Sequence, residues 1–265
     1  METDNREFSG RTVLVTGGGT GLGRATAIAF ASAGASVAIF SRSMDHLGPV
    51  AEELRALGAT ALPIAGDVRS PEEVEAAAQK IEEELGAIDV LVNNAAGNFL
   101  IPAEELTPNG FRSVVEIVLH GTWFCSSVVG RRMLARHRGS IVNVVATYAE
   151  TGMPGVVHSA AAKAGVLSIT RTLAAEWGSR GIRVNAIAPG IMVTEGAAQN
   201  LHFTDEKVQE RLKRQIPARR FATLEEIADA ILYLASARAA YITGDCLYVD
   251  GGLSLPSGFG IVPPR

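Results

Sequence analysis

TGGGTGLG, residues 16–23, follows the apolar run TVLV (12–15) and opens an amphipathic, helix-length stretch. Glycines at such a junction let the backbone turn sharply and approach a pyrophosphate, whose charge the amide groups at the helix N-terminus then hold. Any tight connection between a strand and a helix also needs glycines, so a purely structural interpretation stays open. The stretch predicts the first βα unit of a dinucleotide-binding fold.

Strand-like and helix-like stretches alternate along the rest of the chain. Continuous apolar strands separated by helix-length stretches are typical of a parallel sheet. We therefore predict an α/β fold, with one doubly wound Rossmann-type parallel sheet and helices on both faces, formed by a single domain over residues 1–265. The expected strands are TVLVT (12–16), SVAIF (36–40), ALPIA (61–65), DVLVN (89–93), SIVNVV (140–145), RVNAIA (183–188) and CLYV (246–249). The expected helices include 22–33, 71–85 and 161–177.

Local signals set the limits of some segments. Ser70 is a good helix cap, Pro71 suits the first helical position, and the acidic residues Glu72 and Glu73 favour the positive end of the helix dipole. Residues 191–220 carry fewer motifs and are expected to form a substrate lid. The glycines and prolines of residues 252–265 predict an irregular C-terminal tail.

The composition argues against several kinds of partner. A net charge of −4 gives no basic surface for nucleic acid or anionic lipid, and 6% aromatic residues provide no stacking platform. Cys125 and Cys246 lack metal-ligand spacing, so we expect reduced thiols and no metal. The N-terminal stretch METDNREFSG resembles no targeting signal, and no apolar run reaches the roughly 18 residues that span a bilayer. We expect no nucleic-acid or membrane partner and a cytoplasmic protein.

The end of the second expected strand indicates which nicotinamide cofactor is used. Ser41 and Arg42 stand where an acidic residue would bind the ribose 2′-hydroxyl of NADH. An arginine at this place favours the 2′-phosphate of NADPH. An ordinary solvated charge is the alternative interpretation of Arg42.

Several separated motifs resemble the short-chain dehydrogenase/reductase superfamily: TGGGTGLG, Asp67 after the third strand, NNAAG (93–97), Lys163 in a helix and RVNAIAPG (183–190). The resemblance covers nearly the whole chain. It implies NAD(P)(H) in an extended groove and, as is common in the superfamily, a homotetramer; with Arg42 present, we expect the cofactor to be NADPH/NADP+. The cofactor-binding residues it implies, together with the residues considered above, are Gly17, Thr20, Gly21, Leu22, Gly23, Ser41, Arg42, Asp67, Val68, Asn94, Ala95, Ala96, Lys163, Pro189, Gly190 and Ile191.

The catalytic set common in that superfamily is mostly missing. Most members reduce carbonyls with a serine, a tyrosine, a lysine and an asparagine, and the tyrosine donates a proton to the carbonyl oxygen. Here Lys163 matches, but the tyrosine position is Ser159, the serine position is Ala146 and the asparagine position is Val118. Either the chain is inactive or its reacting groups have moved.

Two residues favour a relocated site. Tyr148 lies two residues beyond Ala146, and Asn98 follows the fourth strand, so both belong to the carboxyl edge of the sheet where ligands bind. A phenol and an amide that converge on one oxygen make an oxyanion site. A packing tyrosine and a turn asparagine are the alternative interpretations.

A narrower resemblance links these residues. TGGGTGLG, SRSMD, NNAAGNF, TYAETG, SAAAKAG and LAAEWG together resemble the 2,4-dienoyl-CoA reductases of fatty-acid β-oxidation, in particular the mitochondrial type. The resemblance implies an acyl-CoA or other acyl-thioester substrate and the catalytic residues Tyr148, Asn98, Ser159 and Lys163. It also implies hydride addition at C5, a dienolate held by Tyr148 and Asn98, and protonation at C2 to give a 3-enoyl-CoA.

Some alternatives stay open. His120 and His158 either donate a proton or are structural, and the basic residues of 206–220 either bind the phosphates of CoA or belong to a solvated face. Besides dienoyl-thioester reduction, a carbonyl or alcohol oxidoreductase with Tyr148 as its acid and a non-catalytic NADPH-binding protein are possible functions.

Overall fold

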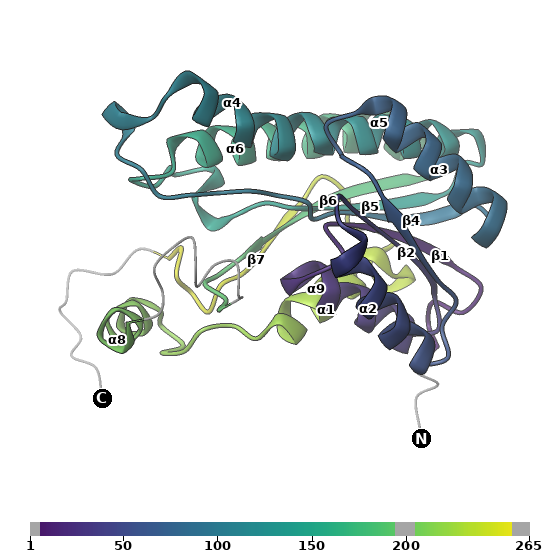
Figure 1. Cartoon of the computed structure of the whole chain (residues 1–265), viewed down its shortest axis with the longest axis horizontal. Coiled ribbons are helices and arrows are strands. Elements are labelled where there is room, and N and C mark those ends of the chain that lie inside the picture. The colour runs from purple at the N-terminus through teal and green to yellow at the C-terminus, as the bar shows by residue number, and fades with distance from the viewer. Residues whose placement is uncertain (1–5, 194–204, 256–265) are drawn as a thin grey trace.

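The structure, a computed structural model, describes residues 6–193 and 205–255. Seven strands in these ranges form one parallel sheet in the order β3-β2-β1-β4-β5-β6-β7 (Figure 1). The order runs outward in both directions from β1 and β4, which confirms the doubly wound fold. The strands are β1 (Thr12–Thr16), β2 (Ser36–Ser41), β3 (Ala61–Ala65), β4 (Ile88–Asn93), β5 (Gly139–Val144), β6 (Ile182–Pro189) and β7 (Cys246–Val249).

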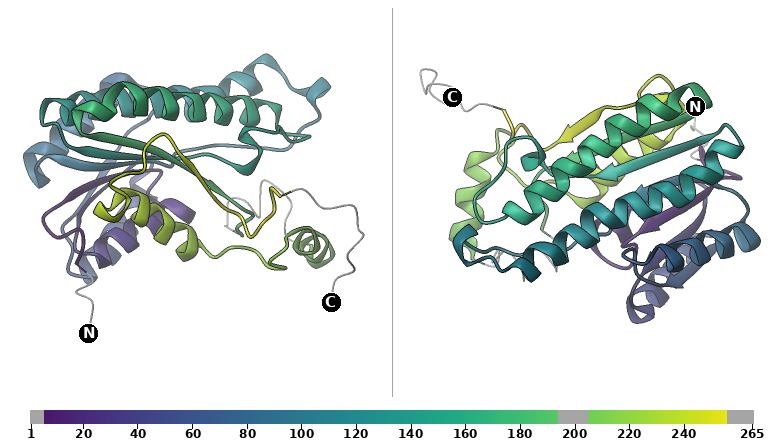
Figure 2. Two further views of the ribbon diagram at one scale, coloured as in Figure 1. Left: turned by 180° about the vertical axis from the view of Figure 1, so that it is seen from behind. Right: turned by 90° about the horizontal axis from the view of Figure 1, so that it is seen from above.

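Helices cover both faces of the sheet. Figures 1 and 2 show α1, α2 and α9 on one face and α3, α4, α5 and α6 on the other, and each layer buries its own apolar cluster against the strands. The longer helices are α1 (Gly21–Ser32), α2 (Met44–Ala56), α3 (Pro71–Leu85), α4 (Pro108–Val115), α5 (Gly121–Ala135), α6 (Val157–Trp177), α8 (Glu206–Gln215) and α9 (Leu224–Ala235). The short elements are η1 (Ala103–Glu105), the π-helical turn η2 (Glu116–His120), η3 (Thr147–Ala149), η4 (Gly178–Arg180) and η5 (Ala237–Ala239).

The predicted elements agree closely with the structure, with one exception. Every predicted strand lies within one residue of the observed limits, and α3 starts at Pro71, where the Ser70 Oγ accepts from the Glu73 N–H at 3.2 Å. The predicted helix 161–177 is wrong at its start, because α6 begins at Val157. Val157, His158 and Ser159 are weak helix formers, but the side chains of His158 and Ser159 are buried, so tertiary packing extends the helix.

The predicted lid and tail are only partly described. Of the lid, 191–220, the structure describes α8 and its flanks, whereas residues 194–204 lie outside the described ranges. Most of the predicted tail, residues 256–265, also lies outside them.

One long helix passes a simple test of length and apolar composition. Among the described residues, the continuous helical segment Pro108–Ala135 is long and apolar enough to cross a membrane, and half of its most apolar window is buried inside the fold. The buried core helix of a globular protein can have the same length and apolar composition.

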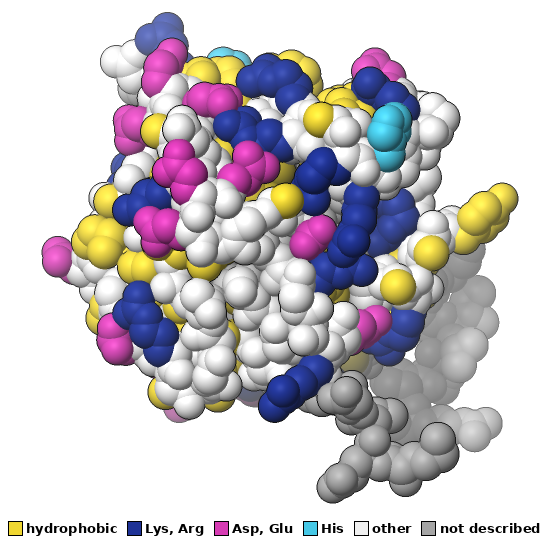
Figure 3. Space-filling model, turned by 90° about the vertical axis from the view of Figure 1, so that its right-hand side faces the viewer, with side chains coloured by type: hydrophobic (Ala, Val, Ile, Leu, Met, Phe, Trp, Pro, Cys, Tyr) yellow, Lys and Arg dark blue, Asp and Glu magenta, His cyan; other side chains and the backbone are white. Residues whose placement is uncertain are grey.

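Figure 3 shows a face where basic and acidic side chains both occur, with hydrophobic ones scattered between them.

The sheet reverses its order between β1 and β4, and Thr16 joins the loops that follow these two strands. Its Oγ1 accepts from the backbone N–H groups of Asn94 and Ala95, each at 3.0 Å, and donates to the Val92 carbonyl at 3.3 Å. The Asn94 Nδ2 donates back to the Thr16 carbonyl at 2.9 Å. The glycine turn and the loop after β4 therefore form one rigid edge.

A glycine exchange tests how closely this edge is packed. A Cβ at Gly23 would collide with the Gly17 carbonyl oxygen and lie 2.6 Å from the Asn94 Nδ2, whereas a Cβ at Gly178, which has helical φ −57° and ψ −44°, meets nothing within 4 Å. Gly23→Ala is expected to lower the free energy of unfolding by about 2 kcal/mol or more through overpacking. Gly178→Ala is expected to raise it by about 0.5 kcal/mol. Urea unfolding measures both, and equal effects would contradict the packing argument.

Candidate active site

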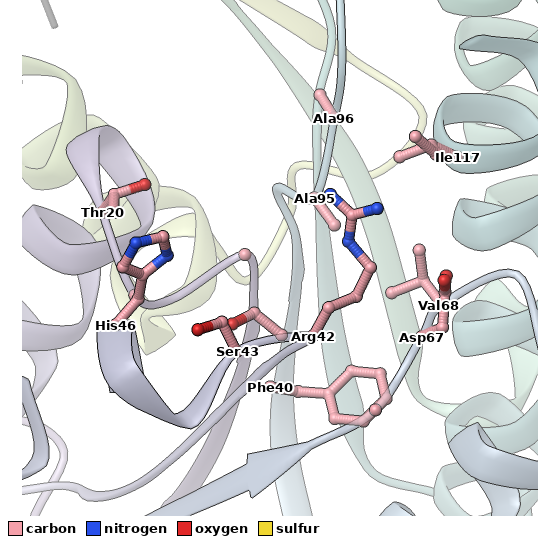
Figure 4. A pocket seen from close by; sticks show the side chains of 14 residues that line it. Thr20, Phe40, Arg42, Ser43, His46, Asp67, Val68, Ala95, Ala96 and Ile117 are labelled. Atoms are coloured by element: carbon pink, nitrogen blue, oxygen red, sulfur yellow. The ribbon is translucent and has the colours of Figure 1, made fainter. Parts of the chain in front are cut away.

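A cavity of about 460 Å³ opens at the carboxyl edge of the sheet (Figure 4). Its walls come from the glycine turn, the start of α2, the turn after β3 and the loop after β4. The lining residues are Gly17, Gly19, Thr20, Phe40, Ser41, Arg42, Ser43, His46, Gly66, Asp67, Val68, Ala95, Ala96 and Ile117.

The structure brings part of the predicted cofactor set to this cavity. The predicted residues on its wall are Gly17, Thr20, Ser41, Arg42, Asp67, Val68, Ala95 and Ala96. Gly21, Leu22 and Gly23 instead form the first turn of α1, and the Asn94 side chain holds the glycine turn. Pro189 ends β6, and the next two predicted residues line a separate hollow of about 140 Å³. Those two residues are Gly190 and Ile191.

Two helix N-termini with free hydroxyl groups meet at the cavity. Thr20 is the N-cap of α1 and Ser43 is the N-cap of α2, yet neither side chain makes a capping hydrogen bond. Both residues line the cavity. Because amides and the helix dipole favour anions at such ends, the cavity fits a ligand that carries negative charge at two places.

Arg42 adds a positive charge between these ends. Figure 4 shows its side chain reaching into the cavity, with Ser43 and His46 toward one side and Asp67 toward the other. Within the described residues Arg42 forms no salt bridge. Ser43 and His46 were missed in the sequence, although both follow Arg42 within four residues and the start of a helix after the second strand is a recognisable signal.

Asp67 is held by a neighbour rather than left free. The Arg69 guanidinium donates to both of its carboxylate oxygens, from Nε to Oδ1 at 3.0 Å and from Nη2 to Oδ2 at 2.5 Å. This hydrogen bond lowers the pKa of Asp67, and the charge of Arg42 adds to the effect. The carboxylate is therefore fixed at the edge of the cavity.

A second cluster brings three of the predicted catalytic side chains together. The Tyr148 hydroxyl lies 3.1 Å from the Ser159 Oγ, and the Asn98 Nδ2 donates to the same hydroxyl at 3.4 Å. These residues come from η3, the first turn of α6 and the loop after β4. Burial raises the pKa of Tyr148, so its phenol stays protonated and can donate a hydrogen bond at neutral pH.

Lys163, the fourth predicted catalytic residue, lies one helical turn after Ser159. Its ammonium group is buried and donates to the Val144 carbonyl at 2.5 Å. Burial lowers its pKa to about 8, so the side chain still carries most of its charge at neutral pH. No direct hydrogen bond to the other three residues is present among the described residues.

Of the positions vacated by the common catalytic set, the serine and asparagine positions, Ala146 and Val118, do not supply polar side chains. Val118 is buried in the π-helical turn η2 and packs in the apolar cluster that also includes Val166 of α6. His120 is exposed. Among the described residues, no group of three or more His, Cys, Asp or Glu side chains could hold a metal ion.

Comparison with known proteins identifies the family. The family model described as enoyl-(acyl carrier protein) reductase matches residues 17–254. A crystal structure of a short chain dehydrogenase from Bacillus anthracis is 43% identical, with a TM-score of 0.85, and the match covers 96% of this chain and 99% of that one. The chain belongs to the short-chain dehydrogenase/reductase family.

Two curated relatives of this short-chain dehydrogenase/reductase share a more specific name. A probable 2,4-dienoyl-CoA reductase of Bacillus subtilis, named as (2E)-enoyl-CoA-producing, is 46% identical over 91% of this chain and 96% of its own length. A peroxisomal 2,4-dienoyl-CoA reductase of Rattus norvegicus, named as (3E)-enoyl-CoA-producing, is 42% identical over 94% and 86%. The protein is thus an oxidoreductase similar to 2,4-dienoyl-CoA reductases, and its family uses NAD(P).

The buried Lys163 of this short-chain dehydrogenase/reductase makes stability depend on pH. Its pKa falls from 10.5 to about 8 on folding, so between these values the unfolded chain holds a proton that the folded chain releases. Stability from this group is therefore lost as the pH falls through about 8 and is regained toward about 10.5. The free energy of unfolding of the wild type minus that of Lys163→Met is expected to increase from about pH 7 to about pH 10.

Urea unfolding without cofactor measures this difference at each pH. The exposed Lys80→Met is the matched control for the loss of one lysine. A difference for Lys163→Met that does not change with pH would show that the folded-state pKa is not lowered.

Proposed function

We propose that the protein reduces a conjugated 2,4-dienoyl thioester, carried by CoA, with NADPH as hydride donor. The observation that carries the proposal is the convergence of Tyr148, Asn98 and Ser159 in a family member that has no tyrosine at the usual catalytic position. The names of the two relatives support the same substrate class.

Tyr148 and Asn98 provide the two donors that a developing oxyanion requires. As electrons move through the conjugated system, negative charge gathers on the thioester oxygen, and a phenol and an amide aimed at one point stabilise it. Each such donor contributes on the order of 3 kcal/mol in comparable sites. Ser159 holds the phenol through a contact of 3.1 Å between its Oγ and the Tyr148 hydroxyl.

The reaction needs no side chain to protonate the oxygen permanently. When bound, NADPH supplies a hydride to C5 of the dienoyl group. A proton at C2 then leaves a double bond between C3 and C4, whereas a proton at C4 leaves it between C2 and C3. We propose the first outcome, a 3-enoyl-CoA; the two relatives are named for different products, so product analysis is part of the test.

The preference for NADPH follows from charge at the cavity. The glycine turn and the uncapped end of α1 suit the pyrophosphate, while Arg42, Ser43 and His46 surround the uncapped end of α2. A 2′-phosphate placed there would meet a guanidinium and free hydroxyl and amide donors. The lysine at the site, Lys163, would hold the nicotinamide ribose and keep the local potential positive.

The proposal extends to the carrier and the assembly. The basic side chains of α8 and the turn after it suit the phosphates of CoA, and Lys207, Arg211 and Arg214 form no ion pair among the described residues. Phe111 of α4 and Trp123 of α5 are exposed at 39% and 43%, which suits a subunit contact in a homotetramer.

Loss of the phenol tests the proposed oxyanion site. Tyr148→Phe is expected to lower kcat with trans,trans-2,4-hexadienoyl-CoA by about 100-fold, because one of two donors to the developing charge is lost. The measurement is NADPH oxidation at about 340 nm, the ordinary absorbance of the reduced nicotinamide. Tyr241→Phe, at a fully exposed tyrosine, is the matched control.

The same assay separates the proposal from its alternatives. Acetoacetyl-CoA and crotonyl-CoA are offered beside the dienoyl substrate. Faster turnover of acetoacetyl-CoA would favour a carbonyl reductase, and cofactor binding without turnover of any substrate would favour a non-catalytic protein. The position of the double bond in the product, read by NMR, distinguishes protonation at C2 from protonation at C4.

A separate substitution tests the cofactor preference. Arg42→Ala is expected to raise the Kd for NADPH about 10-fold or more and to leave the Kd for NADH nearly unchanged, since only NADPH carries the 2′-phosphate. Arg55→Ala, in the last turn of α2 and outside the cavity, is the control. Fluorescence titration measures both constants, and an equal loss for both cofactors would remove Arg42 from this role.

A further inference from the structure

The side chains of the proposed oxyanion site belong to a closed ring of contacts. Ser159 contacts the Tyr148 hydroxyl, which accepts from the Asn98 amide. The Asn98 Oδ1 in turn accepts from the backbone N–H of Phe99 at 2.9 Å. The Phe99 ring packs on the ring of His158, with centroids 4.4 Å apart and planes 32° from parallel. His158 precedes Ser159 in the chain, which closes the ring of contacts.

Phe99 is held on a second side by α4. A Cβ added at Gly110 would lie 3.3 Å from the Phe99 Cζ and 3.1 Å from the Leu106 Cδ1, so the phenyl ring packs closely against the backbone of α4 there. Phe99 therefore lies between the N-terminal part of α4 and His158. The cap of α4 fixes the position of Gly110, because the Thr107 Oγ1 accepts from the Gly110 N–H at 3.1 Å. The ring of His158 is the other group that packs against Phe99.

Among the described residues, no hydrogen bond of ordinary geometry explains why residue 158 is a histidine. Its side chain is 0% exposed, and neither ring nitrogen has a hydrogen-bond partner among the described residues. A buried polar group without a partner is uncommon and calls for an explanation. Burial lowers the pKa of His158 and outweighs the opposite effect of the Phe99 backbone, so the imidazole is neutral at neutral pH and packs as a flat, uncharged ring.

We propose that His158 is a positioning residue whose ring packs against Phe99 and thereby holds the Asn98 amide within hydrogen-bond distance of the Tyr148 hydroxyl. The inference rests on the proposed function only for the identity of the reaction. The ring contact determines where Phe99 lies, the Phe99 N–H determines the orientation of the Asn98 carbonyl oxygen, and the amide nitrogen of Asn98 is then turned toward Tyr148. His158 does not touch the substrate, because its side chain has no exposed surface.

The ring and the nitrogens of His158 can be separated by two substitutions. His158→Phe keeps a flat ring of similar size and removes both nitrogens, whereas His158→Ala removes the ring. His158→Ala is expected to lower kcat about 10-fold or more with little change in the KM for NADPH, because a small displacement of a positioned donor is costly. His158→Phe is expected to restore kcat to within about three-fold of the wild type.

Leu173→Val is the matched control for lost packing. Leu173 is buried on the same helix but lies in the cluster beneath α3 and α5, away from the ring of contacts. The substitution is expected to lower the melting temperature without changing kcat. If Leu173→Val lowers kcat as much as His158→Ala, the effect is general loss of stability and the proposal is wrong. If His158→Phe is as impaired as His158→Ala, the nitrogens are used and ring packing is not the role.

A measurement without turnover separates this proposal from the proposed function. The protein has four tyrosines, so 13Cζ-labelled tyrosine gives few NMR signals, and Tyr148→Phe assigns one of them. His158→Ala is expected to shift the Tyr148 signal and to bring the pKa of its phenol closer to the ordinary value, while His158→Phe leaves both nearly unchanged. An unchanged Tyr148 signal in His158→Ala would overturn the positioning role even in a protein that reduces no dienoyl-CoA.

Discussion

The hydrogen bonds of the Thr16 hydroxyl join the two loops on which both proposed ligand sites depend. A parallel sheet whose order reverses between two strands leaves a crevice at their carboxyl ends, because the loops there diverge to opposite faces. In this protein, hydrogen bonds hold the two loops beside the crevice together. Thr16 binds the backbone after β4, and Asn94 binds the backbone after β1, so the glycine turn of the cofactor cavity and the segment leading to Asn98 share one support.

The proposed relocated site depends on this arrangement. Ser159 occupies the position where the family usually carries a tyrosine, and Lys163 lies one helical turn after it. The phenol of Tyr148 comes from η3, after β5, and its hydroxyl lies within hydrogen-bond distance of Ser159. Tyr148, which belongs to a different element, thus brings a phenol next to the Ser159 position. Asn98 contributes a second donor from the loop after β4, which the usual set does not use at this point.

The sequence predicted most of the fold because its signals are local. Strand limits follow from continuous apolar runs, and the start of α3 follows from Ser70 and Pro71, where side chain and backbone interact within one turn. The first turn of α6 could not be predicted in this way, because its residues favour other structures and are helical through burial. Contacts between residues far apart in the sequence were harder to predict. Tyr148 and Asn98 were identified as candidates, but the packing of Phe99 between Gly110 and His158 depends on three separate elements. Arg42 was the one residue near the start of α2 that the sequence suggested for cofactor binding. Ser43 and His46 reach the cavity because α2 begins beside it, and the sequence does not give that position.

Burial determines the charge state of the site as well as its shape. The same cause raises the pKa of Tyr148 and lowers those of Lys163 and His158. At neutral pH the phenol and the imidazole are therefore uncharged, and the ammonium of Lys163 is the positive charge of the cluster. A reaction that develops one negative charge on an oxygen is best matched by neutral donors in contact with that oxygen and one fixed cation nearby, since strong ion pairing in the ground state would bind substrate and transition state alike. The low polarity around these groups makes each hydrogen bond stronger than it would be in water. The burial of His158 thus serves the site in two ways, because it removes a second cation and provides the flat surface on which Phe99 packs.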